Sequence, residues 1–432
     1  MFEQALLAMA SVATDPYLLF LIFATTILGV IIGVLPGLGA TTGAALLLPF
    51  TLTMDPVHAI AVLATIYVSA TFAGSITAIL INTPGTSAAA ATTFDGYPLA
   101  QKGEAGRALG VAVISSTVGG VFSVIVLCFA APLLARVAYE FRSPEYFALT
   151  VFGLSMLASI SAGGAVKNLI GGIFGVWLST IGAERVTGIE RFMFGNYELY
   201  EGLHFVPIFI GLFAISELLV QSKTVNKIVN TVSMKAVKLP TKEDYKKIWK
   251  TILRSCGIGT FIGVLPAEGA TVASMIGYSE ARRWSKNKEE FGKGSIEGIA
   301  GAEAANNSAT GGAMVPTMVL GIPGSGTTAI ILVGLMVHGL RPGVYLFTEQ
   351  VEKVYQIFGS MFFANIMFML MGLYAAKIFA RVSLVPTAIL WPIVFGLSVI
   401  GAYAFQGQLL DVWLALIFGV IGFFARRHGF SV

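Results

Sequence analysis

Two short Pro/Gly-rich motifs, far apart in an apolar chain, constrain the fold more than any other feature of this sequence. GVLPGLGAT occupies residues 33–41, and GVLPAEGAT occupies residues 263–271. Lipid offers the backbone no hydrogen-bond partners, so a membrane-spanning chain tolerates a broken helix only where the break is buried in protein or lines a watery cavity. Equivalent breaks in two halves of a chain therefore indicate a binding site between internal repeats, as in transport proteins.

A second pair of breaks follows the first. NTPGTSAA stands at residues 82–89, and GIPGSGTTA stands at residues 321–329. Pro36 and Pro266 are 230 residues apart, and Pro84 and Pro323 are 239 residues apart. The similar offsets predict the repeat of a whole domain.

Composition places the chain among membrane proteins. Of its 432 residues, 56% are hydrophobic and only 12% are charged, which excludes a soluble protein. Spanning the hydrocarbon core takes roughly 20 apolar residues. Stretches of suitable length lie near residues 57–82, 106–135, 144–163, 165–182, 203–221, 299–322, 352–380, 383–402 and 408–425. We therefore expect an all-α polytopic membrane protein.

The distribution of basic residues predicts the topology. Nine Lys and Arg residues lie at 223–254 and five at 282–293, on both sides of the second motif. Basic loops stay in the cytoplasm, so residues 255–281 are interpreted as a re-entrant hairpin that enters and leaves on that side. The matching hairpin, residues 17–54, has flanks without positive charge and is placed at the outer face. The halves are then inverted copies; if each hairpin were a single crossing, they would be parallel.

This interpretation divides the chain into three parts. Residues 1–221 form the first repeat, with the hairpin at 17–54 and a broken helix around 82–87. Residues 222–254 form a basic cytoplasmic linker beside the lipid bilayer. Residues 255–432 form the second repeat, with the hairpin at 255–281 and a broken helix around 321–328. The second repeat has one crossing fewer, so a last C-terminal helix is expected to be missing.

The long motifs at residues 74–110 and 291–343, together with those above, resemble the large membrane subunit of tripartite tricarboxylate transporters, the TctA family. The resemblance runs over essentially the whole chain. It implies a multi-pass permease of the bacterial inner membrane that takes up citrate-like di- or tricarboxylates, driven by a gradient of sodium or protons. It also implies two partners, a small four-helix TctB-like membrane subunit and a periplasmic TctC-like binding protein. The carboxylate, the coupling ion and a homodimer of the complex stay open.

Helix N-termini and free backbone N–H groups can hold such an anion near the middle of the membrane. The predicted substrate-binding residues are those of the two breaks and two amides that precede the second one: Asn82, Thr83, Pro84, Gly85, Thr86, Ser87, Asn306, Asn307, Pro323, Gly324, Ser325, Gly326 and Thr327. The alternatives are simple Pro/Gly kinks for the breaks and interhelical hydrogen bonds for the amides.

The hairpin tips supply carbonyls and hydroxyls, which are hard oxygen ligands suited to sodium. The predicted cation-binding residues are Gly37, Gly39, Thr41, Glu268, Gly269, Thr271, Glu303 and Ser308. Glu268 and Glu303 are acids at membrane depth, where charge is costly and usually functional. Either could carry a coupling proton or neutralise a sodium ion.

The competing functions are an anion channel of the same inverted-repeat architecture and a membrane enzyme. A channel cannot accumulate its solute. An enzyme needs a reactive set of His, Cys or Ser with a base at one depth, and the four His and two Cys are scattered. We therefore expect no enzyme, no nucleic-acid partner, and no cofactor or metal beyond sodium as the coupling ion. Among transport mechanisms, an elevator-like slide is favoured over rocking.

Overall fold

The computed structural model describes residues 2–160, 164–184, 187–222, 237–265 and 269–430. The chain forms two compact units, each assembled from separate segments. The first contains residues 1–44, 53–140 and 226–386, and the second contains residues 45–52, 141–225 and 387–432. Each unit is described by itself.

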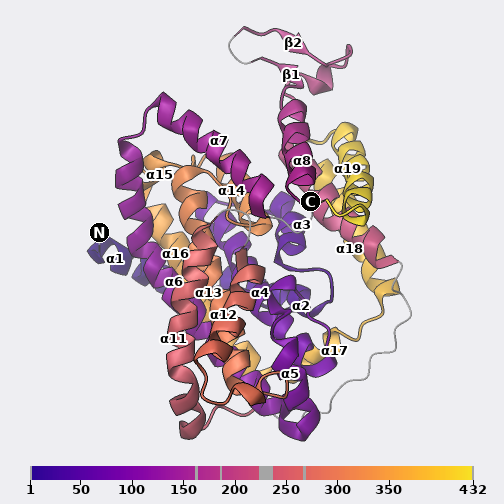
Figure 1. Ribbon diagram of the computed structural model, residues 1–432. Helices are drawn as coiled ribbons and strands as arrows, with labels where there is room; N and C mark the ends of the chain where they lie inside the picture. Colours follow the sequence, from indigo (N-terminus) through magenta and orange to yellow (C-terminus); the bar gives the residue numbers. More distant parts are fainter. Residues whose placement is uncertain (1, 161–163, 185–186, 223–236, 266–268, 431–432) are drawn as a thin grey trace. The chain divides into compact units, whose positions relative to one another are not determined.

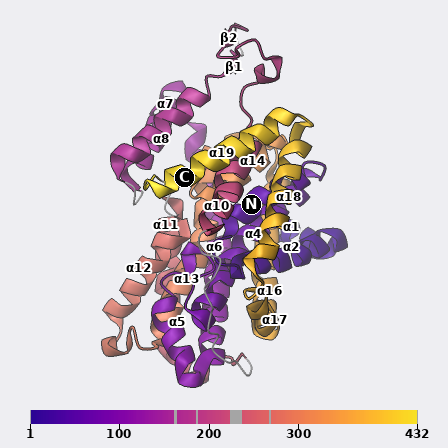
Figure 2. The same cartoon turned by 90° about the vertical axis from the view of Figure 1, so that its right-hand side faces the viewer.

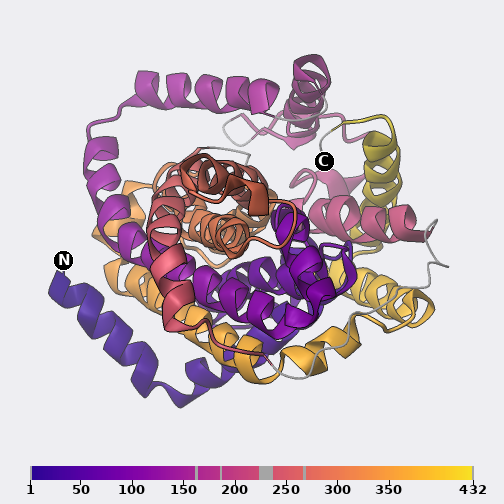
Figure 3. The ribbon, with the colours of Figure 1, turned by 60° about the horizontal axis from the view of Figure 1, so that its bottom comes forward.

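The first unit is helical in the part that the structure describes (Figure 1). Its elements are α1 (Phe2–Thr14), α2 (Pro16–Val34), the start of α3 (Ala40–Thr51), α4 (Pro56–Ile81), η1 (Ser87–Ala89), α5 (Thr93–Leu99), η2 (Ala100–Glu104), α6 (Ala105–Tyr139), α11 (Lys242–Val264), α12 (Gly269–Trp284), η6 (Lys288–Glu290), α13 (Ile296–Leu320), α14 (Gly326–Val337), α15 (Val344–Thr348), α16 (Val351–Tyr374) and α17 (Ala376–Val382). Helices α11, α12 and α13 pack side by side (Figure 2), and α1, indigo beside the N mark in Figure 3, packs on α16.

The second unit contains the end of α3, the remaining helices and a small strand pair. Its elements are α7 (Ser143–Ile160), α8 (Ala165–Leu178), β1 (Gly182–Ala183), β2 (Glu190–Arg191), η3 (Tyr197–Leu199), α9 (Phe205–Phe209), η4 (Ile210–Ile215), α10 (Ser216–Gln221), α18 (Thr387–Gln406) and α19 (Leu409–Arg427). The strands are antiparallel, with Gly182 opposite Arg191. Helix α19 packs on α9, η4, α10 and α18, and Arg426 pairs with Glu217 of α10.

The predicted apolar stretches form helices, so the expectation of an all-α protein is confirmed. Six helical segments of the described part are long and apolar enough to cross a membrane: Pro16–Val34, Pro56–Ile81, Thr93–Tyr139, Val351–Tyr374, Ile389–Gln406 and Leu409–Arg427. Helix α11 begins at Lys242, so the last part of the predicted linker is helical. The turn between α2 and α3 lies where the first hairpin tip was predicted. Helix α11 ends at Val264 and α12 begins at Gly269, on either side of the centre of the second motif.

Two helices form the centre of the first unit. Helix α4 is apolar and is buried from Ala59 to Ile81. Helix α13 carries Glu303, Asn306 and Asn307 and is buried along almost its whole length. Because buried polar groups are shielded from lipid by surrounding protein, a helix as polar as α13 can occupy the core of a membrane protein. Its neighbours α6, α11 and α12 provide that shield.

The two buried helices each contact a preceding helix through glycine. A Cβ added to Gly33 of α2 would lie 2.4 Å from the carbonyl oxygen of Ala70 in α4. A Cβ added to Gly263 of α11 would lie 2.4 Å from the carbonyl oxygen of Ala309 in α13. These pairs are separated by the offsets of the sequence repeat, 230 residues for the glycines and 239 for the alanines. Both crossings therefore depend on direct backbone contact, which only glycine permits.

The same correspondence recurs one turn earlier. A Cβ on Gly29 would lie 2.0 Å from the hydroxyl oxygen of Ser69, and one on Gly259 would lie 2.1 Å from the hydroxyl oxygen of Ser308. Each half of the chain thus has two glycines on one helix that contact a serine and an alanine on the next helix, at matched positions.

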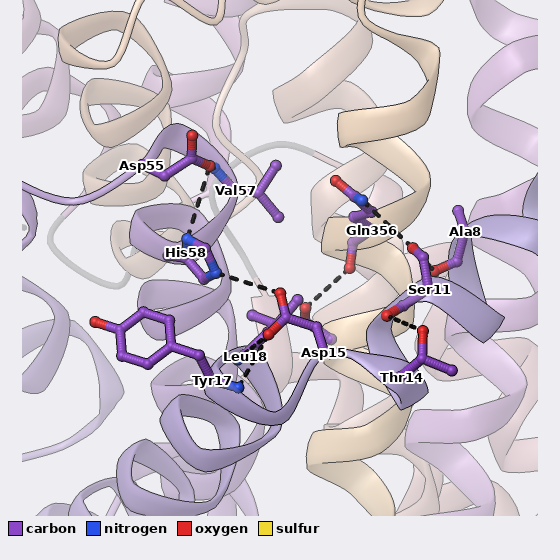
Figure 4. Close-up of polar contacts among 11 residues, drawn as sticks. Ala8, Ser11, Thr14, Asp15, Tyr17, Leu18, Asp55, Val57, His58 and Gln356 are labelled. Carbon is purple, nitrogen blue, oxygen red and sulfur yellow. Dashed lines mark hydrogen bonds and ion pairs between the residues drawn. The ribbon is translucent and has the colours of Figure 1, made fainter.

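His58 lies between two acidic caps at the N-terminal ends of α2 and α4 (Figure 4). Asp15 accepts the N–H groups of Tyr17 and Leu18, and Asp55 accepts that of Val57. The imidazole Nε2 is 3.7 Å from Asp15, and its Nδ1 is 3.8 Å from Asp55. The pKa of Asp15 is lowered, chiefly by the hydrogen bond from Leu18 and further by the hydrogen bond from Tyr17 and the neighbouring imidazole. Together these outweigh desolvation, which would raise the pKa. This cluster joins the ends of two helices that pack together.

The ends of α6 and α11 are joined by a second polar cluster. The Arg107 guanidinium donates to Asp244 at 2.5 Å and to Glu104 at 2.7 Å. Asp244 also completes a capping box with Thr241 at the start of α11. Desolvation alone would raise the pKa of Asp244, but the hydrogen bonds from Arg107 and Thr241 outweigh it and lower that pKa.

The glycine crossings lead to a prediction with a control on the same helix. Gly263→Ala places a methyl group against the backbone of α13, and such overpacking costs about 1–3 kcal/mol. Gly257→Ala, also on α11, meets nothing within 4 Å, and its higher helix propensity is worth up to ~1 kcal/mol. Thermal unfolding in detergent should show a lower Tm for G263A and an unchanged or higher Tm for G257A. Equal Tm values would contradict the close crossing.

Candidate functional site

The first break begins where α4 ends at a left-handed residue. Asn82 has φ 55° and ψ 27°, and its N–H group donates to the carbonyl of Thr77. The N–H group of Thr83 donates to the same carbonyl at 3.4 Å. Asn is one of the few residues other than glycine that enter this conformation readily. Helix α4 therefore stops with the Thr77 carbonyl accepting both N–H groups and with Asn82 exposed.

The second break repeats this geometry with glycine. Gly321 ends α13 with φ 68° and ψ 21°, and its N–H group donates to Pro316. The N–H group of Ile322 donates to the same carbonyl at 3.3 Å. The backbone is equivalent, but only the first break presents an amide side chain at this position.

A glycine in each break lies against the facing helix. A Cβ on Gly85 would lie 1.9 Å from the carbonyl oxygen of Gly33, and one on Gly324 would lie 3.0 Å from that of Gly263. The N–H group of Gly85 donates to Gly74 at 3.2 Å, and that of Gly324 donates to the Thr317 hydroxyl at 3.3 Å. The breaks thus pack against the glycine crossings, with these backbone donors satisfied.

The chain continues differently after the two breaks. Ser325 caps the twelve-residue helix α14 in a capping box with Thr328. After the first break, Ser87–Ala89 forms a single 3₁₀ turn, and the next α-helix, α5, begins only at Thr93. Of the two breaks, the second thus leads directly into a helix N-terminus, with its N–H groups and partial positive charge.

Each hairpin tip contains a left-handed glycine. Gly37 has φ 89° in the first tip, residues 35–41, and Gly269 has φ 46° in the second tip, residues 265–271. The N–H group of Leu35 donates to Ile32, and that of Leu265 donates to Ile262. Glu268, a predicted cation ligand, lies outside the described residues.

Each tip contacts both breaks. The Thr41 hydroxyl of the first tip hydrogen-bonds that of Thr327 in the second break at 2.8 Å. The Thr271 hydroxyl of the second tip donates to that of Ser87 in the first break at 2.9 Å. Each tip also approaches the break of its own half, through Gly39 in the first tip and Gly269 in the second.

These own-half approaches are made by glycines. A Cβ on Gly39 would lie 3.9 Å from Thr86, and one on Gly269 would lie 3.1 Å from the Cβ of Ser325. Four segments that are distant in the sequence therefore converge, and they contain most of the predicted site residues.

The buried helices also reach across to the opposite break. The Ser325 hydroxyl donates to the phenolic oxygen of Tyr67 in α4 at 3.3 Å, and the Asn306 amide of α13 donates to the carbonyl of Ala88 at 3.3 Å. Asn306 was predicted from its polarity. Tyr67 was missed, because a tyrosine in an apolar helix has no motif around it; its only signal is the 239-residue offset from Asn306.

Two polar groups at this centre are buried without a hydrogen-bond partner among the described residues. They are the Thr86 hydroxyl and the Asn307 carbonyl oxygen. The Asn307 amide group donates to Asn306 at 3.0 Å. Buried polar groups are nearly always paired in native proteins, so these two mark places for water or a ligand.

Two of the predicted cation ligands have partners away from the tips. The Ser308 hydroxyl lies between α13 and α11, where it donates to Ala305 at 3.2 Å. The Glu303 carboxylate accepts hydrogen bonds from the hydroxyls of Thr92 and Ser116. In the part of the chain that the structure describes, no group of three or more His, Cys, Asp or Glu is arranged to hold a metal ion.

These features define a multi-pass α-helical membrane protein whose buried centre is built from interrupted helices. The chain belongs to the tripartite tricarboxylate transporter TctA family, whose model matches residues 19–432. It is therefore a membrane subunit of a tripartite transport system that includes other subunits, in a family of transporters rather than enzymes.

Two proteins of Agrobacterium vitis are similar to this chain. One, described as an uncharacterized 52.8 kDa protein in the TAR-I ttuC' 3' region, is 38% identical over 409 residues, which cover 94% of this chain and 81% of the relative. The other, described as an uncharacterized protein in the TAR-II ttuC' 3' region, is 33% identical over 171 residues, which cover 40% of this chain and 71% of the relative. No solved structure matches the chain significantly.

Cysteine pairs test the contacts between tips and breaks. The Thr41→Cys/Thr327→Cys pair and the Ser87→Cys/Thr271→Cys pair should each form a disulfide on mild oxidation, because the native hydroxyls are 2.8 and 2.9 Å apart and a disulfide needs Cβ atoms about 3.5–4.5 Å apart. Mass spectrometry of peptides under non-reducing conditions identifies the link. The four single variants are the controls, since Cys128 and Cys256 are buried. Absence of both links would overturn the arrangement.

Proposed function

We propose that this chain is the large permease subunit of a secondary transporter that imports citrate-like di- or tricarboxylates across the bacterial inner membrane. A periplasmic binding protein would deliver the carboxylate, a small membrane subunit would complete the complex, and a cation gradient would drive uptake. The observation that carries this proposal is the contact of each tip with both breaks, because it unites four predicted binding segments in one place.

The two ends of a carboxylate would meet different donors. The first turn of α14 offers the N–H groups of Gly326 and Thr327 with the positive end of the helix dipole. The first break offers hydroxyl and amide side chains, of which Asn82, Thr83 and Ser87 are exposed. The first turn of α12 contacts both breaks, through Gly269 and Thr271, so one extended anion could reach both sets of donors.

The cation would bind beside this anion. Gly37, Gly39 and Thr41 in the first tip, and Gly269 and Thr271 in the second, supply carbonyl and hydroxyl oxygens that suit sodium. Protons are the alternative coupling ion. In either case positive charge offsets part of the substrate's negative charge, which lowers the cost of holding it away from water.

We propose further that the halves are inverted repeats with re-entrant hairpins. The matched glycine contacts and the matched breaks support a repeat at offsets of 230 and 239 residues. Movement of the tips and breaks against the remaining helices, as in an elevator, would alternate access. An anion channel could share this architecture, and accumulation against a gradient would separate the two.

Labelling from the two sides of the membrane tests the inversion. Cysteines introduced at Asp55 and at Lys238 should react with a membrane-impermeant maleimide from opposite sides, Asp55 from outside and Lys238 from the cytoplasm. Inside-out and right-side-out vesicles provide the comparison. Reaction of both positions from the same side would exclude the inverted assignment.

Uptake into proteoliposomes tests the function and its site. The complete tripartite complex should accumulate labelled citrate or another carboxylate under an inward cation gradient, whereas equilibration without accumulation would favour the channel. Asn82→Gly keeps the left-handed conformation that Gly321 adopts and removes only the amide. Because a hydrogen bond to a charged group contributes about 1.5–3 kcal/mol, N82G should weaken apparent affinity roughly 10- to 100-fold.

The matched control is Gly321→Asn, which places an amide at the equivalent position of the second break and keeps a residue that tolerates its φ. It should retain uptake. Thermal stability of N82G should equal that of the wild type, since the backbone conformation is preserved. An unchanged affinity in N82G would remove Asn82 from the site.

A further inference from the structure

Glu303 is a fully buried carboxyl group surrounded by neutral donors. It is 0% exposed in the middle of α13. One carboxylate oxygen accepts the hydroxyl of Thr92, and the other accepts that of Ser116 in α6 at 2.7 Å. None of the ion pairs among the described residues includes Glu303. Hydroxyl dipoles alone offset little of the cost of burying a full negative charge.

The charged and titratable groups of the surrounding helices have other partners or positions. Among the described residues, the side chains that interact with the Glu303 carboxyl group are all neutral: Thr92, Ser116 and Asn306. Asp95 of α5 accepts hydrogen bonds from the N–H groups of Gly292, Gly294 and Ser295, and Tyr278 of α12 lies beside it. Arg107 of α6 pairs with Glu104 and Asp244. Tyr67 of α4 accepts a hydrogen bond from Ser325, and Glu297 of α13 accepts one from Ser285. Cys256 of α11 is buried, and α14 carries no titratable residue.

Glu303 and Asn306 hold both ends of the turn that follows the first break. Asn306, one helical turn after Glu303, donates to the carbonyl of Ala88 at 3.3 Å, and Glu303 accepts from Thr92. Ala88 belongs to η1, which starts at Ser87, the residue that contacts the second tip. Thr92 thus connects Glu303 to the chain segment that includes the end of the first break.

We propose that Glu303 binds the coupling proton and that its protonation repositions the turn beside the first break. This inference rests on the proposed carboxylate uptake and specifies its coupling ion. The step is a simple exchange with water: one O–H bond forms on the carboxylate as a hydronium ion gives up its proton, and the reverse occurs on release. An ionised carboxylate accepts from both hydroxyls, whereas the protonated acid also donates one hydrogen bond, so one of the two hydroxyls must turn.

The surroundings of Glu303 favour a proton over sodium. Sodium in transporters is coordinated by carbonyls of unwound backbone. Glu303 instead lies within the continuous helix α13, whose carbonyls accept helical hydrogen bonds, and both of its oxygens are already engaged by hydroxyls. A proton needs no further ligand and removes the buried charge.

The test compares Glu303→Gln with the wild type in proteoliposomes that contain the complete complex. Two rates are measured: accumulation of labelled carboxylate under an imposed inward proton gradient without sodium, and exchange of labelled for unlabelled carboxylate at equal pH. Wild type should accumulate. E303Q should fall to the equilibrium level yet exchange within about threefold of wild type, because the amide keeps the size and most hydrogen bonds of the acid. Glu297→Gln, on the same helix, should retain both rates.

Three outcomes would overturn the proposal. E303Q could accumulate the carboxylate as well as the wild type does, or a folded E303Q could lose both accumulation and exchange. The wild type could also accumulate the carboxylate only under a sodium gradient. Failure of the wild type to exchange any carboxylate would instead overturn the proposed function. Infrared difference spectroscopy tests proton binding by Glu303 without a need for transport. The wild type should show a carboxylic-acid band that changes with pH, and this band should be missing in E303Q.

Ser116→Ala keeps the test decisive if E303Q does not fold. Removing one donor leaves the ionised carboxylate less stabilised, so the pH profile of accumulation should move toward higher pH while exchange persists. Ser115→Ala, at the neighbouring position of α6, should leave the profile in place. An S116A profile that coincides with the wild type would contradict a proton on Glu303.

Discussion

Direct contact between backbones at two glycine crossings supports the rest of the first unit. Gly33 lies against Ala70, and Gly263 lies against Ala309, without a side chain between the helices. Because the helices approach this closely, the glycines of the two breaks, Gly85 and Gly324, can pack against the same crossings. In lipid, where helix association depends on close packing, small residues make such approaches possible. The interrupted segments are thereby held in protein, where their N–H groups find partners.

Much of this architecture could be predicted from the sequence. The Pro/Gly motifs located both tips and both breaks, and their spacing predicted the correspondence that the matched contacts now display. The apolar stretches predicted the helices. These signals are local or periodic, so a linear reading detects them. The length of the helix after the first break was not predictable, because Ser87 and Ser325 begin similar sequences but only Ser325 completes a capping box.

The partners of the site residues could not be found in this way. Tyr67 and Ser116 have no motif around them, and the long motif that contains Thr92 gave this residue no role. Each of the three contacts a residue more than 180 positions away. Helix α13 shows the same limit at a larger scale. Residues 299–322 were recognised as a stretch of spanning length, but Glu303, Asn306 and Asn307 gave no sign that this helix is among the most buried of the unit. Only its tertiary neighbours explain how such a helix is tolerated.

The unequal pair Asn82 and Gly321 gives the centre a polarity. Both residues end a buried helix in the same left-handed backbone conformation, but one bears an amide and the other bears no side chain. A full α-helix also follows directly on the second break, at Ser325, whereas the first break is followed by a 3₁₀ turn. A molecule that occupies both breaks therefore has a head and a tail in this centre, even when its own two ends are chemically identical.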